Sequence, residues 1–198
     1  AADADESAFA ELAAGLALGR SHLEHRAAIV ARAGRDAAVQ LSEWLEHQGE
    51  QVALGRRSSQ RVVFLLPGQG SQWRGMALGL LEHEPVFRAA MERVDALVMQ
   101  LADWSVLDEL RGAATSERFE RIATVQPIIF ATQVALAELW RSWGIEPDAV
   151  IGHSMGETAA AHIAGALSLE DAAAVLVRRC RLMAQLGGSG SMLAVELD

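Results

Sequence analysis

The stretch Gly152-His153-Ser154-Met155-Gly156 constrains the fold of this chain more than any other part of the sequence. It follows the apolar run 149–151, which is typical of a buried strand, and it precedes a helical pattern that begins at Glu157. Gly-x-Ser-x-Gly between a strand and a helix is typical of a nucleophile elbow, in which glycines make room beside an exposed serine. The pattern therefore predicts an α/β fold with Ser154 as a nucleophile. A tight turn without catalytic function is the alternative interpretation.

The first sixty residues form a separate part of the sequence. They are expected to contain a helix, a strand and a second helix, and the polar stretch that follows is typical of a linker. The residues concerned are 8–18, 25–31, 35–48 and 54–61. This part shows no catalytic spacing, so we expect a small structural α/β unit over residues 1–60.

Residues 61–198 alternate between strand and helix patterns. We expect parallel strands, the first of them covered on both faces, in an α/β sandwich. The expected strands are 62–66, 149–151 and 192–195. One helix is expected to begin near Pro85, and a second to span 127–140 with a proline in its first turn. A third helix is expected after Ser154, and a fourth to begin at the capping box of Ser168 and Asp171.

Composition excludes several classes of function. The net charge of −9 argues against a nucleic-acid partner, and no apolar run approaches the roughly 20 residues that span a membrane. Cys180 is the only cysteine, so neither an intrachain disulfide nor a cysteine zinc cluster is possible, and we expect no bound metal and a cytoplasmic location. The absence of lysine excludes Schiff-base catalysis and a Ser-Lys dyad.

A serine nucleophile needs oxyanion donors and a base. The glycine-rich stretch Pro67–Gln72 follows a strand and could supply a backbone N–H; a phosphate loop is the alternative, but no Gly-Lys-Ser/Thr follows. His153 adjoins Ser154 and is expected to point away from it, although it could line the pocket. His162 is roughly 12 Å along the helix. The chain therefore offers no well-placed base.

Three arginines, 178, 179 and 181, lie in one helical run. Such a run is usually a solvated face, and successive helical residues point in different directions. One of the three could turn inward and bind a carboxylate with its guanidinium.

Several stretches together resemble the malonyl-type acyltransferases of fatty-acid and polyketide synthases. They are PGQGSQ, TVQPIIFATQVALAELW, VIGHSMGETAAAHIAGALSLEDA and RRCRLM, and they occur in the order seen in that family. LALGRSHLEHRAAIVAR is similar to the linker between the ketosynthase and the acyltransferase of modular polyketide synthases. The resemblance implies a hydrolase-like three-layer α/β/α core with a short parallel sheet, of which 61–198 would be the N-terminal part, after a small α+β linker domain over 1–60.

The resemblance also implies residue roles. Ser154 would be the nucleophile, the amides of Gln69 and Met155 the oxyanion hole, and Arg179 the partner of the substrate's free carboxylate, with Gln126 and His153 near the pocket. No cofactor is implied. The substrates would be an extender acyl-coenzyme A thioester, malonyl- or methylmalonyl-type, and the phosphopantetheinylated acyl carrier protein, and the adjacent ketosynthase domain would be a further partner.

This sequence also departs from the family pattern. Family members continue into a small subdomain and return to the core with the catalytic histidine, so we expect that histidine and the remaining C-terminal part of the acyltransferase beyond Asp198, and little activity from this chain alone. Met155 favours malonyl and the stretch 121–126 favours methylmalonyl, so the extender stays open. Two alternatives remain: a serine hydrolase, such as a thioesterase or editing enzyme, and an inactive docking or scaffold fragment.

Overall fold

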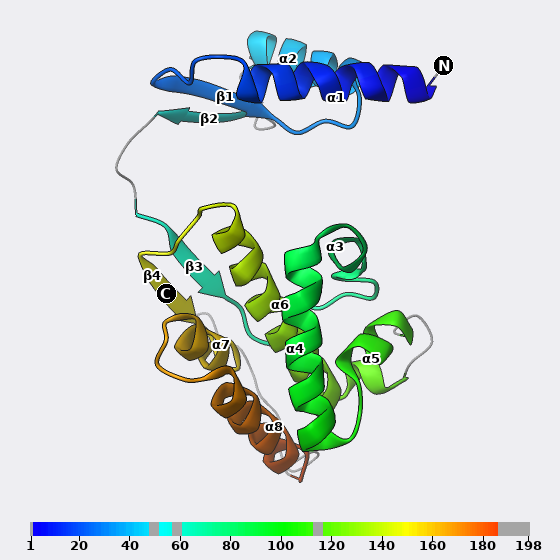
Figure 1. Ribbon diagram of the computed structural model, residues 1–198, viewed down its shortest axis with the longest axis vertical. Helices are drawn as coiled ribbons and strands as arrows, with labels where there is room; N and C mark the ends of the chain where they lie inside the picture. The colour runs from blue at the N-terminus through cyan, green and yellow to red at the C-terminus, as the bar shows by residue number, and fades with distance from the viewer. Residues whose placement is uncertain (1, 48–51, 57–60, 113–116, 186–198) are drawn as a thin grey trace, which may run out of the picture. The chain divides into compact units, whose positions relative to one another are not determined.

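The computed structural model describes residues 2–47, 52–56, 61–112 and 117–185 (Figure 1). It divides into two compact units, Ala1–Gln60 and Arg61–Asp198. The strand expected over 192–195 and the glycine-rich end of the last helix at 187–191 lie outside the described residues.

The first unit pairs two helices with a two-stranded antiparallel sheet. Its elements are α1 (Ala2–Leu18), β1 (His25–Ile29), α2 (Gly34–His47) and β2 (Val52–Arg56). His25 lies opposite Arg56 and Ile29 opposite Val52 in the ladder. The expected linker at 54–61 is therefore wrong for its first three residues, because residues 54–56 gain backbone hydrogen bonds from a strand far away in sequence, which local composition does not reveal.

The second unit is built around one parallel strand pair. Its elements are β3 (Val63–Leu66), α3 (Leu78–His83), α4 (Pro85–Ala102), α5 (Val106–Gly112), a 3₁₀ turn (Glu117–Glu120), α6 (Ile122–Ser142), β4 (Ala149–Gly152), α7 (Gly156–Ile163) and α8 (Leu169–Gln185). Val63 lies opposite Ala149 and Leu66 opposite Gly152. The expected parallel strands are confirmed, and α6 forms the crossover between them, as a parallel pair requires.

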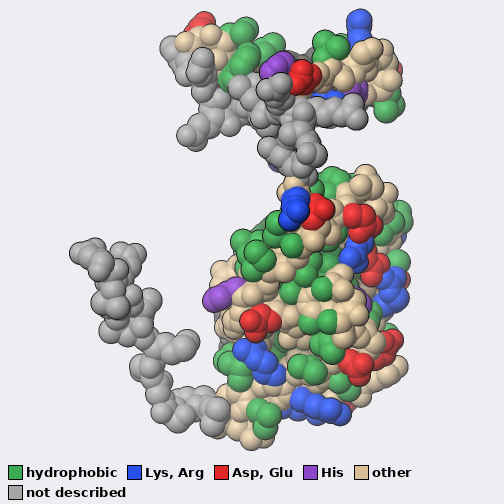
Figure 2. Space-filling model, turned by 90° about the vertical axis from the view of Figure 1, so that its left-hand side faces the viewer, with side chains coloured by type: hydrophobic (Ala, Val, Ile, Leu, Met, Phe, Trp, Pro, Cys, Tyr) green, Lys and Arg blue, Asp and Glu red, His purple; other side chains and the backbone are tan. Residues whose placement is uncertain are grey.

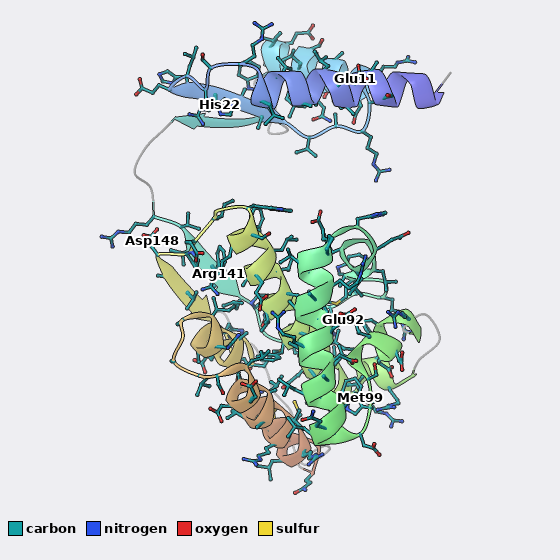
Figure 3. All side chains as sticks on the ribbon, viewed as in Figure 1. Glu11, His22, Glu92, Met99, Arg141 and Asp148 are labelled. Carbon is teal, nitrogen blue, oxygen red and sulfur yellow. The ribbon has the colours of Figure 1, made fainter. Side chains whose placement is uncertain are left out.

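The strand pair is held together at its start by Asp148. The Val62 N–H donates to Asp148 Oδ2 at 2.8 Å, and the Asp148 N–H donates to the Val62 carbonyl oxygen at 2.8 Å. Figure 3 labels Asp148 beside the beginning of β3. This reciprocal pair fixes the register that brings the ends of β3 and β4 to the same level.

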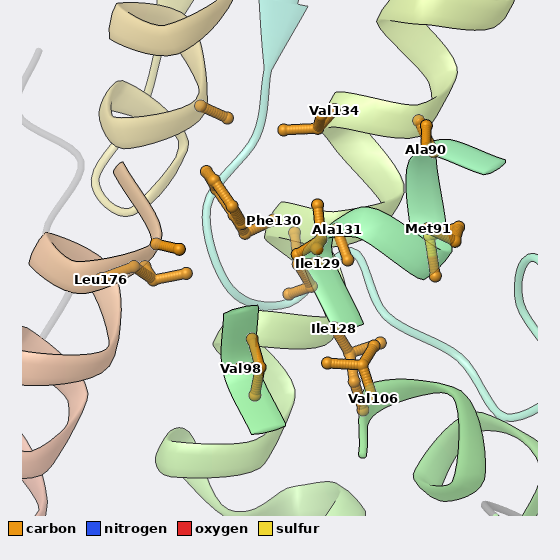
Figure 4. Packing of buried hydrophobic residues seen from close by; sticks show 14 of the residues in the cluster. Ala90, Met91, Val98, Val106, Ile128, Ile129, Phe130, Ala131, Val134 and Leu176 are labelled. Carbon is orange, nitrogen blue, oxygen red and sulfur yellow. The ribbon is translucent and has the colours of Figure 1, made fainter. Parts of the chain in front are cut away.

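Helix α6 is the central element of the core. It packs against α4, α7 and α8, and Phe130, Ile128 and Ala131 have no exposed surface. Figure 4 shows these side chains between Leu176 of α8 and Val106 of α5. In the described residues α6 is the one helix long and apolar enough to cross a membrane, but 78% of its apolar window is buried. The expectation that no apolar segment reaches this length is therefore wrong, and α6 is a core helix.

Helix α6 also begins earlier than the sequence predicted. It starts at Ile122, so Pro127 lies inside the helix and not in its first turn. A proline there lacks the N–H that would bond to the Ala123 carbonyl. Thr124, Val125 and Gln126 before it are all buried, and this packing holds the additional turn in helical form.

Strand β3 is buried on only one face in the described part of the chain. Phe64 and Leu66 turn toward the core, whereas Val63 is 48% and Leu65 70% exposed. In β4, Ile151 on the same open face is 55% exposed. The expectation of a strand covered on both faces is therefore wrong for these residues, because no described helix lies over that face.

Helix α8 begins as the capping box predicted. The Asp171 N–H donates to Ser168 Oγ at 3.0 Å, and Ser168 Oγ donates to Asp171 Oδ2 at 2.8 Å. The helix carries Ala173, Leu176 and Cys180 into the core, and this orientation directs Arg179 toward the ends of the strands.

Candidate active site

The ends of β3 and β4 form one platform for the candidate site. The His153 N–H donates to the Leu66 carbonyl oxygen at 2.9 Å, extending the strand pairing by one residue. The loop after β3 lies against this turn, since a Cβ on Gly68 would be 3.1 Å from His153 Nδ1 and 3.3 Å from Ser154 Cβ. Two loops separated by more than eighty residues thus meet at Ser154.

The two glycines that flank the turn are required by close backbone contacts. A Cβ on Gly156 would be 2.8 Å from the Pro67 carbonyl oxygen and closer still to that of Leu66. A Cβ on Gly152 would be 2.5 Å from the Gly156 carbonyl carbon and closer still to the backbone of Glu157. Only glycine lets helix α7 approach the strands this closely.

Ser154 has the backbone geometry of a nucleophile elbow. Its φ is +55°, in the left-handed region that non-glycine residues rarely occupy. Such conformations cost about 1–3 kcal/mol and cluster at functional sites. Its side chain is exposed, whereas the neighbouring Met155 is fully buried. The turn therefore presents the hydroxyl to solvent and anchors itself through the next residue.

The resemblance implied that two backbone amides, those of Gln69 and Met155, form an oxyanion hole. Met155 precedes the first residue of α7, and Gln69 lies in the loop after β3. Within the described residues neither N–H donates to a backbone acceptor. Free amides at a helix N-terminus attract negative charge, and the Met155 amide just before α7 is such a group.

Arg179 reaches the site from α8. Its Nη2 donates to Ser154 Oγ at 3.5 Å, and its Nη1 donates to Gln126 Oε1 at 2.9 Å. Gln126 is 2% exposed, and its Nε2 donates to Gln69 Oε1 at 3.1 Å. A buried amide thus holds the guanidinium beside the serine and connects it to the loop after β3.

The other two arginines of the run have different surroundings. Arg178 is exposed, and Arg181 Nη2 donates to the Leu101 carbonyl oxygen. The expectation that one member of the run turns inward toward a site therefore agrees with the geometry of Arg179.

Cys180 contributes to the same arrangement, which sequence reasoning missed. Its thiol is 1% exposed and donates to Gln126 Oε1 at 3.3 Å. Burial raises the pKa of the Cys180 thiol to about 11, and the positive charge of Arg179 partly opposes this rise. The group is therefore a protonated donor at neutral pH and not a nucleophile. It helps to fix the Gln126 amide that holds Arg179.

The described histidines do not supply a base to Ser154. The Ser154 hydroxyl has one hydrogen-bond partner among the described residues, and that partner is Arg179. His162 Nδ1 lies 3.2 Å from the Leu167 carbonyl oxygen, and His83 is exposed beside Glu82. His153 is exposed next to the Gly68 loop, at the rim of the site.

Gln133 is a second residue that sequence reasoning missed. Its Nε2 donates to the Pro67 carbonyl oxygen at 2.7 Å, and its buried Oε1 has no hydrogen-bond partner. A signal was present in the sequence: Gln133 follows Gln126 by two helical turns, so both amides lie on one face of an otherwise apolar helix.

Comparisons with known proteins agree with this geometry. Residues 63–198 match the acyl transferase domain family, and the chain belongs to that family. It is 47% identical over 199 residues to erythronolide synthase EryA2 of Saccharopolyspora erythraea, covering 98% of this chain and 6% of that protein. It is 45% identical over 200 residues to polyketide synthase GfsA of Streptomyces halstedii, covering 100% of this chain and 3% of that protein. The chain thus spans a small fraction of these relatives.

Solved structures give the same family. The acyltransferase domain from module 8 of the salinomycin polyketide synthase is 41% identical with a TM-score of 0.77, over 89% of this chain and 42% of that domain. The acyltransferase domain of ZmaA is 34% identical with a TM-score of 0.74, over 85% of this chain and 39% of that domain. The expected α/β fold and the resemblance to polyketide synthase acyltransferases are confirmed. Hydrolase and scaffold functions are not favoured by these relatives.

Proposed function

We propose that this chain provides the nucleophile half of an acyltransferase site that loads an extender unit in polyketide biosynthesis. The acyl group would pass from coenzyme A through an acyl-serine intermediate to the phosphopantetheine thiol of an acyl carrier protein. The single observation that carries this proposal is the guanidinium of Arg179 beside the exposed Ser154 hydroxyl. A positive charge at that position favours an acyl group that carries its own carboxylate.

Each step of the reaction has a residue suited to it. Ser154 Oγ attacks the thioester carbonyl carbon and loses its proton to a base. The carbonyl oxygen becomes an oxyanion, which the N–H groups of Gln69 and Met155 stabilise. The C–S bond then breaks, coenzyme A leaves as the thiol, and an ester forms on Ser154. Attack by the carrier protein's thiol reverses the sequence and restores the serine.

Substrate selection is assigned to Arg179. Guanidinium groups bind carboxylates through two parallel hydrogen bonds, and of its five N–H donors one bonds to Gln126 and one to Ser154. The remaining donors can bind the free carboxylate of a malonyl or methylmalonyl group. His153 at the rim would contact the thioester or the extender unit. No cofactor takes part, since the acyl group passes only from the coenzyme A thioester to the serine and then to the carrier protein's thiol.

The reaction also requires a base and a carrier protein, which we assign to other parts of the enzyme. We place the catalytic histidine in the part of an acyltransferase domain that this chain does not span. The unit Ala1–Gln60 would serve as the linker to a ketosynthase domain, and the carrier protein would dock near Ser154. The reaction would take place in the cytoplasm, where coenzyme A thioesters and carrier proteins occur.

The mass of the acyl-enzyme tests this proposal. A chimera joins the remainder of the salinomycin module 8 acyltransferase domain after residue 198, and it is incubated with malonyl-, methylmalonyl- or propionyl-coenzyme A. We expect an ester on Ser154 from a dicarboxylic thioester, whose mass identifies the extender, and none in Ser154→Ala. Faster loading of propionyl than of both dicarboxylic groups, or a label retained in Ser154→Ala, would contradict the proposal.

A further inference from the structure

The loop after β3, which carries the Gln69 amide, is held by two buried amide side chains of α6. Gln133 Nε2 donates to the Pro67 carbonyl oxygen at 2.7 Å, and Gln126 Nε2 donates to Gln69 Oε1 at 3.1 Å. Both glutamines are buried in the same helix, about two turns apart. Of the two, Gln126 is the one that also accepts a hydrogen bond from Arg179 of α8. It therefore links the loop after β3 to α8.

The orientation of the Gln126 amide is fixed by the groups around it. A guanidinium has only donors, so the amide atom that lies 2.9 Å from Arg179 Nη1 must be the oxygen. The Cys180 thiol donates to the same oxygen at 3.3 Å. The NH₂ group of Gln126 is thereby directed at Gln69 Oε1, which accepts from it at 3.1 Å. A flipped amide would place its NH₂ group against the donors of Arg179 and would lose its contact with Gln69.

This hydrogen-bond network is shielded from water. Gln126 is 2% and Cys180 1% exposed, and Arg179 is half-buried. The chain has no lysine, so the blue side chains in Figure 2 are arginines, and those shown on the second unit lie on its outer surface near acidic side chains. Hydrogen bonds are stronger where water is excluded, and a buried amide that loses a partner is left with its full desolvation cost. The arrangement in which Gln126 bonds to Arg179, Cys180 and Gln69 together is therefore strongly favoured.

The hydrogen bond from Arg179 to Ser154 does not hold the guanidinium throughout the reaction. Arg179 Nη2 donates to Ser154 Oγ at 3.5 Å in the chain without substrate. Once Ser154 Oγ has attacked the thioester carbon it becomes an ester oxygen, which is a weak hydrogen-bond acceptor. The guanidinium then needs another partner to remain against Gln126. The free carboxylate of the extender unit supplies one, through two parallel hydrogen bonds.

The side chain of Gln69 carries this effect to the reacting carbonyl. The backbone N–H of the same residue is assigned to the oxyanion hole, so an anchored Gln69 side chain restricts the movement of that N–H. We propose that Gln126 is a positioning residue that couples recognition of the extender carboxylate to stabilisation of the oxyanion. A carboxylate bound to Arg179 keeps the guanidinium against Gln126 Oε1, and Gln126 Nε2 in turn holds Gln69. The inference rests on the reaction proposed for Ser154 and adds that its rate depends on the carboxylate.

The coupling predicts that the carboxylate raises the rate of acylation as well as the affinity. Interactions that strengthen only in the transition state raise kcat, whereas equal binding of substrate and transition state lowers KM alone. Preorganised oxyanion donors belong to the first kind. At saturation, a malonyl or methylmalonyl thioester should therefore acylate Ser154 faster than propionyl-coenzyme A does. A carboxylate contact that served binding alone would leave the saturating rates equal.

Gln69→Ala in the chimera tests the coupling. The substitution deletes the acceptor of the 3.1 Å hydrogen bond from Gln126, but it keeps the backbone N–H of residue 69 and the bond between Arg179 and Gln126. Chimera and variant are saturated with the faster dicarboxylic thioester or with propionyl-coenzyme A, and acylation of Ser154 is timed by rapid quench and intact mass. The dicarboxylic rate should fall about tenfold, which is part of the roughly 10²- to 10³-fold effect of a whole oxyanion donor. The propionyl rate and both KM values should change little.

Gln133→Leu is the matched control, because Gln133 holds the same loop at Pro67 and is 7% exposed. Its substitution should slow both thioesters by the same factor. The coupling, but not the reaction, would be overturned by a selective loss of the dicarboxylic rate in Gln133→Leu, by an equal loss for both thioesters in Gln69→Ala, or by equal saturating rates in the unmodified chimera. A chimera that forms no ester on Ser154 would contradict the reaction itself, and the coupling with it.

Discussion

Replacement of Gly156 by alanine tests the close contact between helix α7 and the strands. The added Cβ would lie 2.8 Å from the Pro67 carbonyl oxygen and closer to that of Leu66. Both obstacles are backbone atoms, so no side-chain rotation relieves them, and the N-terminus of α7 must move away from β3. Overpacking of this kind typically costs 1–3 kcal/mol, and alanine recovers about 0.5–1 kcal/mol of helix propensity. The two terms together give an expected net loss of about 1 kcal/mol.

The control for this prediction is Gly79→Ala. Gly79 lies in α3, is exposed, and has no heavy atom within 4 Å of an added Cβ. The same substitution there should stabilise the protein by about 0.5–1 kcal/mol, through helix propensity alone. The two variants thus differ in the sign of the expected effect.

Urea unfolding followed by tryptophan fluorescence measures both effects. Four of the five tryptophans, Trp73, Trp104, Trp140 and Trp143, belong to the second unit, so the signal reports mainly on that unit. In the chimera, Gly156→Ala should also reduce acylation of Ser154, because Met155 moves with the helix. An unchanged midpoint for Gly156→Ala, with the expected rise for Gly79→Ala, would refute the proposed contact.

Two further predictions concern the residues that hold Arg179. Gln126→Leu removes the acceptor of the 2.9 Å hydrogen bond from Arg179. In the chimera the KM for malonyl-coenzyme A should therefore rise about tenfold, equivalent to about 1.4 kcal/mol, while the KM for propionyl-coenzyme A stays unchanged. An equal rise for both substrates would contradict the positioning function of Gln126. For Cys180, a folded pKa of about 11 against 9.0 in the free thiol predicts alkylation at pH 8 about 100-fold slower in the folded than in the urea-unfolded chain, from the thiolate fraction alone. Because the pKa of the folded thiol is raised, its contribution to stability is fully present below about pH 9 and is lost as the pH rises through about 11. Iodoacetamide labelling at equal rates in the folded and the unfolded chain would contradict the raised pKa.

The nucleophile turn was readable from sequence because its constraints are local. Gly152, Ser154 and Gly156 lie within five residues, and the apolar run before them and the helix after them fix the context. The capping box at Ser168 is local in the same sense. Such features combine residue type with spacing, and the structure has the turn and the cap where the sequence indicated them.

Features that depend on distant partners were not readable in this way. Strand β2 forms because it pairs with β1, and the bond from Arg179 to Gln126 joins residues 53 positions apart. The resemblance to acyltransferases suggested that both residues lie near the pocket, but not that one holds the other. Pro127 was misleading for a different reason: proline is common in the first helical turn, but here buried packing extends α6 beyond it.

The open face of the strand pair has a similar cause. An apolar run such as 62–66 indicates a strand that is buried on both faces in a complete sheet. Within the described residues only one face is covered, and Leu65 is 70% exposed. The apolar sequence of this strand therefore indicates more burial than the described part of the chain provides.

The competition between two thioesters for Ser154 tests the central claim most directly. The chimera and its Arg179→Ala variant are each given equal concentrations of methylmalonyl- and propionyl-coenzyme A, with malonyl- and acetyl-coenzyme A as a second pair, and the two esters on Ser154 are counted by intact mass. A charge-assisted carboxylate contact is worth about 1.5–3 kcal/mol. For the pair whose dicarboxylic thioester is preferred, Arg179→Ala should therefore shift the ratio of the two esters about 10- to 100-fold toward the monocarboxylic group. An unchanged ratio in both pairs would contradict the assignment of Arg179 to the extender carboxylate.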